Sequence, residues 1–272
     1  CVLALPGRGE SPELEINWWC GINVELNSGE YRFGQATRYG YIVVSPDWMT
    51  PNQGEYQYTE GEHARILACL RDAFRKLSID TDRVFVSGHF DGATAAWDLA
   101  LAHPDLWAGA IMLSPGADKY IVQYTENIRT QAKNPDQIPL GTYIVYGELD
   151  GTRNSSDLGN VATRYLTTPA YDTMVVEYRG QGRGHFSAEL PRIMEWMQLS
   201  SHRRIRNPQF IEARTMRSGD RFFYWLEAPS LLPKVAGNPI QFVPANYGMF
   251  EARRLESAIN GVMVSSIPSP NR

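Results

Sequence analysis

The chain has 272 residues, of which 43% are hydrophobic, and this suffices for one sizeable core with an appended segment. Its formal net charge is −4, no apolar run approaches the length of a membrane span, and no secretory signal is visible. Cys1, Cys20 and Cys69 are an odd, scattered set without metal-ligand spacing, which indicates ordinary reduced or buried cysteines and not a disulfide framework.

The first 200 residues alternate strand and helix patterns, which predicts an α/β fold with a mainly parallel sheet covered by helices on both faces. The strand candidates are Val2–Leu5, Tyr41–Ser45, Arg83–Ser87, Gly109–Leu113, Thr142–Tyr146 and Met174–Tyr178. The helix candidates are Gly61–Leu77, Gly92–His103, Tyr120–Gln131, Ser155–Leu166 and Ser187–Leu199. Because Cys1 opens directly into an apolar run, we interpret the chain as a fragment or processed form. We expect the first strands, and other domains of a longer parent chain, to precede it.

After about residue 207 the pattern changes to short strands separated by Gly, Pro and Asn, which predicts a small antiparallel β-rich module. The candidates are Phe210–Thr215, Arg221–Glu227, Pro239–Pro244, Met249–Leu255 and Gly261–Ser266, followed by a frayed end at Pro268–Arg272. We therefore divide the chain into an α/β domain over 1–200 and a basic linker with a β-rich module over 201–272.

Charge is divided unevenly between these two parts. Residues 1–200 carry 16 Lys and Arg against 25 Asp and Glu, a balance of −9, and residues 201–272 carry 10 against 5, a balance of +5. The cluster Arg203, Arg204 and Arg206 stands at the junction. We interpret it as a solvated linker that docks on the acidic body. No stacking motif or groove-reading helix supports a nucleic-acid partner.

The stretch 83–96, RVFVSGHFDGATAA, carries the strongest functional signal. A buried-strand pattern leads into Gly88-His89-Phe90-Asp91-Gly92 and then into an alanine-rich helix. The pattern Gly-x-Ser-x-Gly at such a turn presents a nucleophilic serine, and its glycines let the backbones pass closely. Phe90 stands at the serine position. A frame centred on Asp91 would put His89 where glycine is needed, so an aspartate nucleophile is the less favoured alternative.

With this turn, the run His103-Pro104-Asp105-Leu106-Trp107 makes residues 1–200 resemble α/β-hydrolases of the esterase, dienelactone-hydrolase and peptidase-like branch. The resemblance implies the order nucleophile, acid, histidine. The segment 146–151, YGELDG, resembles the acid loop of the family and makes Asp150 the acid. The segment 180–186, GQGRGHF, resembles the histidine loop and makes His185 the base, with Asp150 fixing its tautomer.

The segment 5–10, LPGRGE, stands where these enzymes have a loop that supplies an oxyanion N–H. The resemblance assigns that role to the amide of Arg8 or Gly9, with the Asp91 amide as the second donor.

Phenylalanine has no atom that can attack a carbonyl, so three hypotheses follow from Phe90. The domain is a degenerate hydrolase kept for binding or structure; it is a carboxylic-ester hydrolase whose serine is altered in this version; or Asp91 is a shifted nucleophile. A small ester- or amide-like molecule is the expected ligand. No redox cofactor or metal is implied, since no dinucleotide fingerprint or His/Cys cluster is present.

Overall fold

The computed structural model describes residues 1–21, 35–117, 125–134, 137–206, 208, 210–215, 217, 220, 222–227, 248–254 and 262–267. Its main body is a six-stranded sheet in which every neighbouring pair of strands is parallel, so the predicted α/β class is confirmed. Across the sheet the strands are β2 (Val43–Val44), β1 (Val2–Leu5), β3 (Phe85–His89), β4 (Gly109–Leu113), β5 (Gly141–Gly147) and β6 (Thr173–Tyr178). The direction in which successive strands are added to the sheet reverses between β1 and β3. Ligands of such sheets bind outside the carboxyl ends of the strands at this point of reversal.

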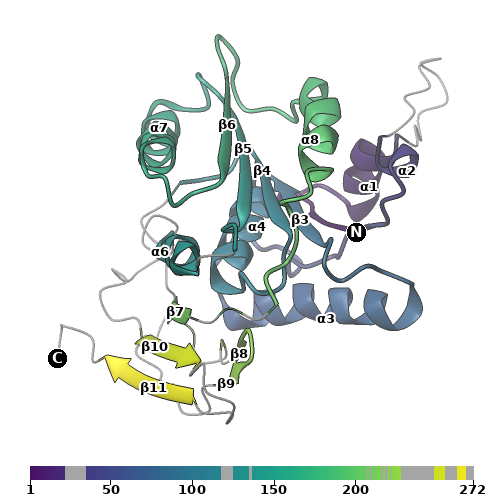
Figure 1. Cartoon of the computed structure of the whole chain (residues 1–272). Helices are drawn as coiled ribbons and strands as arrows, with labels where there is room; N and C mark the ends of the chain where they lie inside the picture. The colour runs from purple at the N-terminus through teal and green to yellow at the C-terminus, as the bar shows by residue number, and fades with distance from the viewer. Residues whose placement is uncertain are drawn as a thin grey trace.

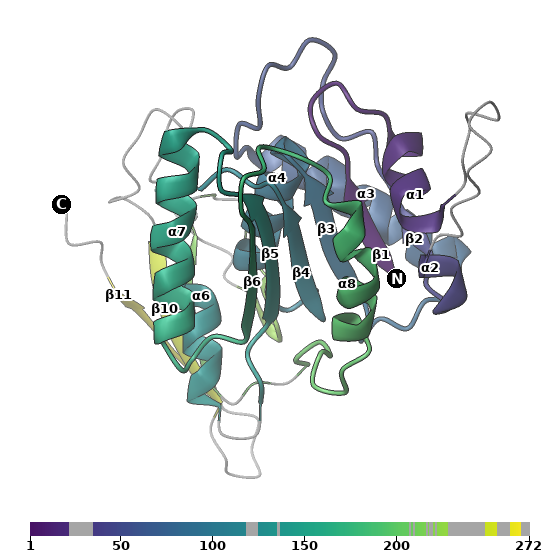
Figure 2. The same cartoon turned by 90° about the horizontal axis from the view of Figure 1, so that it is seen from above.

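Helices cover both faces of the sheet, and Figures 1 and 2 show α7 and α8 on opposite sides. One face packs against α3 (Glu60–Lys76), α4 (Asp91–Ala102), α6 (Glu126–Arg129) and α7 (Thr152–Thr167). The other packs against α1 (Pro12–Cys20), α2 (Gln35–Arg38) and α8 (Leu190–Met197). Short 3-10 turns, η1 (Thr130–Lys133) and η2 (Ser187–Glu189), adjoin α6 and α8. None of the described helices is both long and apolar enough to cross a membrane.

Local chemistry sets where the longer helices begin. Thr59 caps α3 as part of a capping box, since its side chain accepts from the Glu62 N–H and the Glu62 carboxylate accepts from the Thr59 N–H. Ser11 caps α1, Pro12 occupies its first turn, and Gly21 ends it in the left-handed conformation with φ 68°. Neither α1 nor α2 was among the helices predicted from the sequence. Part of the predicted helix Tyr120–Gln131 lies outside the described residues.

The C-terminal part contains an antiparallel sheet of β7 (Phe210–Thr215), β10 (Gly248–Arg254) and β11 (Val262–Ile267). It lies near α6 and η1 (Figure 1), which contact β7. The predicted single strand Arg221–Glu227 is wrong. It is a hairpin of β8 (Phe222–Phe223) and β9 (Leu226–Glu227), because Tyr224 turns the chain with φ 58°. The predicted strand Pro239–Pro244 and the end Pro268–Arg272 lie outside the described residues.

Candidate active site

Phe90 forms a strained turn between β3 and α4. Its φ of 53° and ψ of −116° belong to neither helix nor strand, and a non-glycine residue in such a region costs roughly 1–3 kcal/mol. The surrounding backbone holds it there. The Phe90 N–H donates to the Leu113 carbonyl at 3.0 Å, and its carbonyl accepts from the Thr94 N–H at 3.0 Å.

Two glycines allow this turn to pack against the sheet. A Cβ atom at Gly88 would overlap the backbone of Gly92, and one at Gly92 would overlap the carbonyl oxygen of Leu5. The frame Gly88 to Gly92 is therefore the one in which β1, β3 and α4 approach each other. In that frame Phe90 stands at the tip and Asp91 is the first residue of α4.

The Phe90 ring lies beside the predicted base. The ring centroids of Phe90 and His185 are 5.0 Å apart in an edge-to-face arrangement, and the Arg183 guanidinium carbon lies 4.6 Å from the centroid of the Phe90 ring. Both partners come from the loop after β6. The structure thus brings together the elbow tip and the loop histidine, as their positions after two strands predict.

Glu10 is the hydrogen-bonding partner of His185. His185 Nε2 lies 2.7 Å from Glu10 Oε1, and the other carboxylate oxygen accepts from the Gly7 N–H at 2.9 Å. The hydrogen bond to Glu10 raises the pKa of His185, against the opposing effect of burial. Burial would raise the pKa of Glu10, but the hydrogen bonds from His185 and Gly7 outweigh it and hold that pKa below its usual value. One carboxylate therefore bridges the loop amide and the imidazole.

Asp150, the predicted acid, lies buried in the turn that follows β5. This turn contacts the histidine loop, since the Leu149 N–H donates to the Gln181 carbonyl at 2.8 Å. Within the described residues, however, the side-chain hydrogen bond of His185 goes to Glu10 and not to Asp150. Glu10 reaches Nε2 from the facing loop after β1 and is itself held by the Gly7 amide, so it occupies the imidazole nitrogen that would face the nucleophile.

The predicted oxyanion donors are backbone amides near the Glu10 carboxylate, which bridges Gly7 and His185. The Arg8 side chain is turned away and donates to the Gly54 carbonyl, and Gly9 is exposed with φ 77°. The Asp91 N–H belongs to the first turn of α4, where N–H groups have no intrahelical acceptor. The loop amide that meets an anion is that of Gly7, which sequence reasoning passed over.

A second acid–histidine pair includes His89, the residue that directly precedes Phe90 in the elbow. His89 Nδ1 lies 2.8 Å from Glu15 Oε2, both side chains are buried, and the His89 and His185 rings are 4.8 Å apart. Glu10 and Glu15 were both missed. The available signal was a carboxylate inside the loop 5–10 and another five residues later, both following the strand Val2–Leu5.

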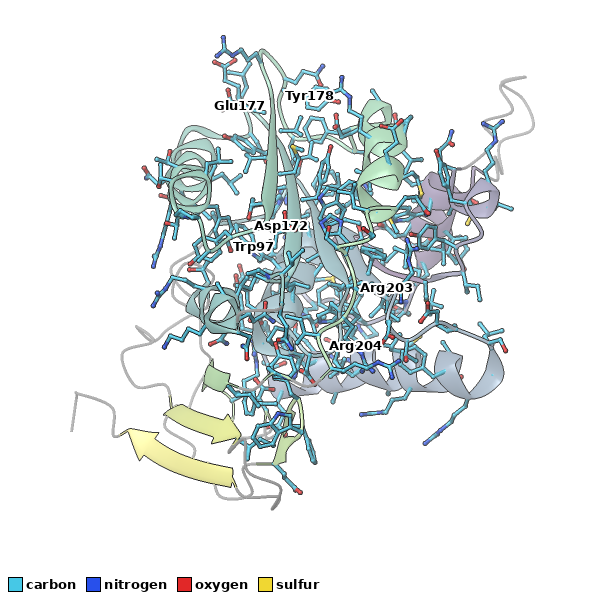
Figure 3. All side chains as sticks on the ribbon, in the orientation of Figure 1. Trp97, Asp172, Glu177, Tyr178, Arg203 and Arg204 are labelled. Carbon is cyan, nitrogen blue, oxygen red and sulfur yellow. The ribbon has the colours of Figure 1, made fainter. Side chains whose placement is uncertain are left out.

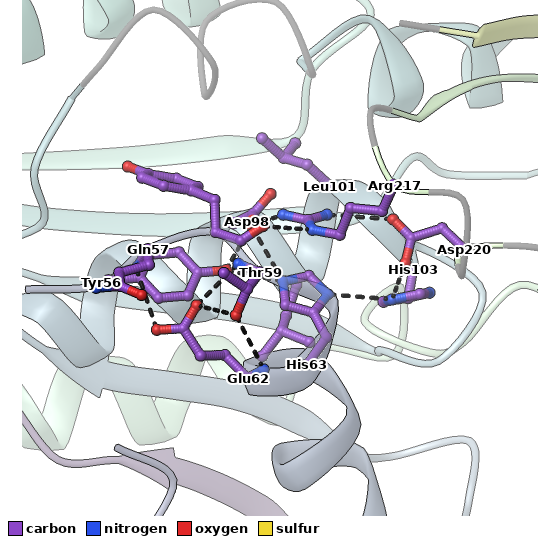
Figure 4. Close-up of polar contacts among 12 residues, drawn as sticks. Tyr56, Gln57, Thr59, Glu62, His63, Asp98, Leu101, His103, Arg217 and Asp220 are labelled. Atoms are coloured by element: carbon purple, nitrogen blue, oxygen red, sulfur yellow. Dashed lines mark hydrogen bonds and ion pairs between the residues drawn. The ribbon is translucent and has the colours of Figure 1, made fainter. Parts of the chain in front are cut away.

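A buried polar network lies away from the elbow and ties the C-terminal segment to α3 and α4 (Figure 4). The Tyr56 hydroxyl lies 2.5 Å from Asp98 Oδ2 and 2.8 Å from His63 Nε2, and His63 Nε2 lies 3.1 Å from Asp98 Oδ2. The Arg217 guanidinium pairs with Asp98 and, at 3.1 Å, with Asp220 Oδ2. Burial acts to raise the pKa of Asp98, but the Arg217 charge and the hydrogen bonds bring it to about 2. Burial lowers the pKa of His63.

Part of this network offers ligand atoms to a cation. One atom each from His63, His103 and Asp220 lies within 4.8 Å of the others. The donor set nevertheless fits a cation poorly. The 3.3 Å between His63 Nδ1 and His103 Nε2 is also the spacing of two nitrogen ligands on one ion, but the Arg217 guanidinium already pairs with Asp220 at 3.1 Å and places a positive charge at this site. An ion-paired network satisfies these groups, so we derive no chemistry through a metal.

No protein-family model and no curated protein sequence matches this chain. Among solved structures, the BES protein from Bacillus cereus is similar with a TM-score of 0.53 and 13% identity, over 73% of this chain and 82% of that one. The chain has the α/β-hydrolase fold. Two further similar structures are a carboxylesterase from Mesorhizobium loti (TM-score 0.49, 16% identity, 72% and 87% covered) and an S-formylglutathione hydrolase from Agrobacterium tumefaciens (0.49, 14%, 72% and 82%). At these identities the likeness extends to the fold alone.

Proposed function

We propose that this chain is a degenerate hydrolase domain that binds a ligand or serves a structural role and does not hydrolyse esters. The observation that carries the proposal is the occupation of the elbow site by the protein's own groups. The Phe90 ring stands at the nucleophile position, and the Glu10 carboxylate takes both the Gly7 amide and Nε2 of His185.

Each of these groups removes one requirement of acyl transfer. An acyl-enzyme needs an atom that attacks the carbonyl and later leaves, and a phenyl ring has none. A general base needs a free nitrogen, yet Glu10 engages Nε2 of His185, and it places a negative charge on the Gly7 amide beside the proposed oxyanion donors. Loss of a triad nucleophile alone lowers kcat by roughly 10⁶-fold.

The second candidate is a carboxylic-ester hydrolase, through a serine at position 90 in the parent protein or through Asp91. The retained turn favours it. The φ of 53° at Phe90 would present a hydroxyl within reach of His185, and Asp150 remains as an acid close to the histidine loop. We propose Asp150 and His185 as the acid and base of that active form, with the Arg8 or Gly9 amide and the Asp91 amide as oxyanion donors.

The test is hydrolysis of p-nitrophenyl acetate by the full chain. We expect no burst and turnover at the solvent background. Phe90→Ser should exceed its matched control Phe90→Ala by roughly 10²-fold, because only the serine can use His185 as a base. His185→Ala in the Phe90→Ser background should remove the gain. Robust activity in the unaltered chain that disappears on Asp91→Asn would overturn the proposal and establish an aspartate nucleophile.

A double variant separates the roles of the two blocking groups. Glu10→Ala added to Phe90→Ser frees the imidazole nitrogen and the Gly7 amide, and we expect a further gain of roughly tenfold. If the double variant is no faster than Phe90→Ser, Glu10 does not block the site, and the proposal then rests on Phe90 alone.

A further inference from the structure

A cavity of about 350 Å³ lies far from the elbow, where the linker, the loop after α4 and the β8–β9 hairpin meet. It is lined by Asp105, Arg204, Ile205, Arg206, Tyr224 and Trp225. The loop after α4 precedes β4, so the cavity lies toward the amino ends of the strands and the elbow lies at their carboxyl ends. Figure 3 shows Arg203 and Arg204 on the segment that leads from α8 toward β7.

Two arginines of the cavity wall keep hydrogen-bonding capacity. Both turn Nε toward the same carboxylate, Asp82 Oδ1, at 3.7 Å from Arg204 and 2.6 Å from Arg206. Within the described part of the chain, the terminal amino groups of both guanidinium groups form no hydrogen bond. A guanidinium presents five N–H donors in a fixed fork that matches a carboxylate or a phosphate. The wall therefore offers two sets of guanidinium N–H donors to an anion.

Asp105 adds a hydrogen-bond acceptor to the cavity wall, opposite in character to the arginine donors. Its Oδ1 atom is buried and, among the described residues, has no hydrogen-bond partner. Buried acceptors are normally satisfied, so this atom is matched to a donor that a ligand could bring. Burial raises the pKa of Asp105 against the opposing charge of His103. A raised pKa favours the protonated carboxyl of Asp105, which can both accept a hydrogen bond from a ligand hydroxyl and donate one to it. A ligand ammonium group would instead need the ionised carboxylate, so a hydroxyl is the better match.

The aromatic part of the wall is rigid. Tyr224 has φ 58° in the two-residue turn of the hairpin, and its hydroxyl accepts from Gln131 Nε2. The Trp225 indole is fixed by a hydrogen bond from Nε1 to the Pro208 carbonyl at 2.9 Å. Side chains fixed in this way lose little entropy on binding, and their rings provide apolar contact area.

We propose that this cavity binds a small polyhydroxylated anion, either a sugar acid or a sugar phosphate. Arg204 and Arg206 hold its anionic group, Asp105 hydrogen-bonds its hydroxyls, and Trp225 contacts the apolar face of its ring. The site shares no residue with the elbow, so it adds a binding activity that is independent of the function proposed above.

The test is isothermal titration calorimetry of the full chain with glucuronate, glucose 6-phosphate, glucose and inorganic phosphate. We expect one of the two sugar anions to bind, which identifies the source of the charge, and glucose to bind at least tenfold more weakly. Absence of binding by both sugar anions at 10 mM, a concentration well above roughly millimolar Kd values, would overturn the proposal. Phosphate binding as tightly as glucose 6-phosphate would overturn its sugar part.

Arginine variants locate the site. Arg204→Gln should weaken the bound sugar anion by roughly ten- to hundredfold through loss of a charge-assisted fork. Arg203→Gln removes the same charge from an exposed neighbour outside the lining and should leave the affinity unchanged. If Arg204→Gln does not fold, as judged by its thermal transition, the more exposed Arg206→Gln takes its place. Equal affinities for all these variants would place the ligand elsewhere and refute the assignment.

Discussion

The elbow site and the buried network both pair histidine with carboxylates, yet their environments give opposite electrostatics. His185 is half exposed, and its hydrogen bond to Glu10 raises its pKa. His63 is buried beside Asp98, and there desolvation dominates and lowers the pKa of the imidazole. The same residue types therefore serve a solvent-facing site in one place and the interior of the fold in the other.

The comparison also separates geometry from function. Tyr56, His63 and Asp98 bring a hydroxyl, an imidazole and a carboxylate within 3.1 Å of each other, which resembles a catalytic arrangement. All three are buried, and Arg217 covers the carboxylate. A hydroxyl–histidine–acid contact indicates catalysis only where a substrate can reach it.

The largest expected effect is loss of the buried counter-ion. Arg217→Met leaves Asp98 and Asp220 without their cation, and we expect a loss of about 3–5 kcal/mol in the free energy of unfolding. Urea denaturation followed by circular dichroism measures it. Arg206→Met, which breaks an exposed pair with Asp82, is the matched control and should leave the transition in place. Equal stabilities for the two variants would mean that the network does not hold the fold.

A substitution at a close backbone contact in the elbow should lower the free energy of unfolding by a smaller amount. Gly92→Ala places a Cβ against the Leu5 carbonyl, and we expect a loss of about 1–3 kcal/mol from overpacking. Gly159→Ala is the control, because no atom lies within 4 Å of its Cβ and it sits inside α7, so it should gain about 0.5–1 kcal/mol. The opposite ordering of their thermal midpoints would contradict the close approach of β1 and α4.

A single hydroxyl in the network tests its completeness. Tyr56→Phe removes a donor to Asp98, and we expect a loss of about 1–2 kcal/mol in the free energy of unfolding. The exposed Tyr39→Phe serves as control and should behave as the unaltered chain. Thermal denaturation compares the two. A neutral Tyr56→Phe would show that Arg217 and His63 satisfy the carboxylate without the tyrosine hydroxyl.

The smallest effect concerns protonation at the elbow. Proton NMR titration should place the pKa of His185 above its ordinary value of about 6.5, and Glu10→Gln should lower it. Since the folded state raises the pKa of His185 and lowers that of Glu10 from its ordinary 4.5, the stability that this pair contributes is fully present between about pH 4.5 and about pH 6.5. It is lost as the pH rises through the raised value. An unchanged His185 titration in Glu10→Gln would show that the bridge is not formed in solution.

Local patterns predicted much of the fold. Strands β1 and β7 occupy the predicted residues, because a short apolar or alternating run that ends before turn-forming residues favours a strand. The elbow was also foreseen, since Gly88 and Gly92 are needed only where backbones touch. Helix α1 was missed because its nine residues are too few for a clear apolar periodicity.

The contacts that decide function were harder to foresee. Glu10 and His185 are 175 positions apart, and His89 and Glu15 are 74 apart. No local pattern relates such pairs. The strand order brings their loops to one edge, but which carboxylate reaches an imidazole depends on side-chain packing, and here Glu10 contacts the Nε2 atom that would face the nucleophile. The division of the chain at residue 200 stays a prediction.

The long separation between Asp98 and Arg217 also has a consequence for biosynthesis. Their ion pair joins residues 119 positions apart. A ribosome adding roughly 5–20 residues per second needs about 6–24 s to make that intervening chain. During this interval Asp98 lacks its guanidinium partner, so its burial as an ion pair must await the synthesis of Arg217. Synthesis order thus makes the segment that carries Arg217 a later addition to the core around Asp98.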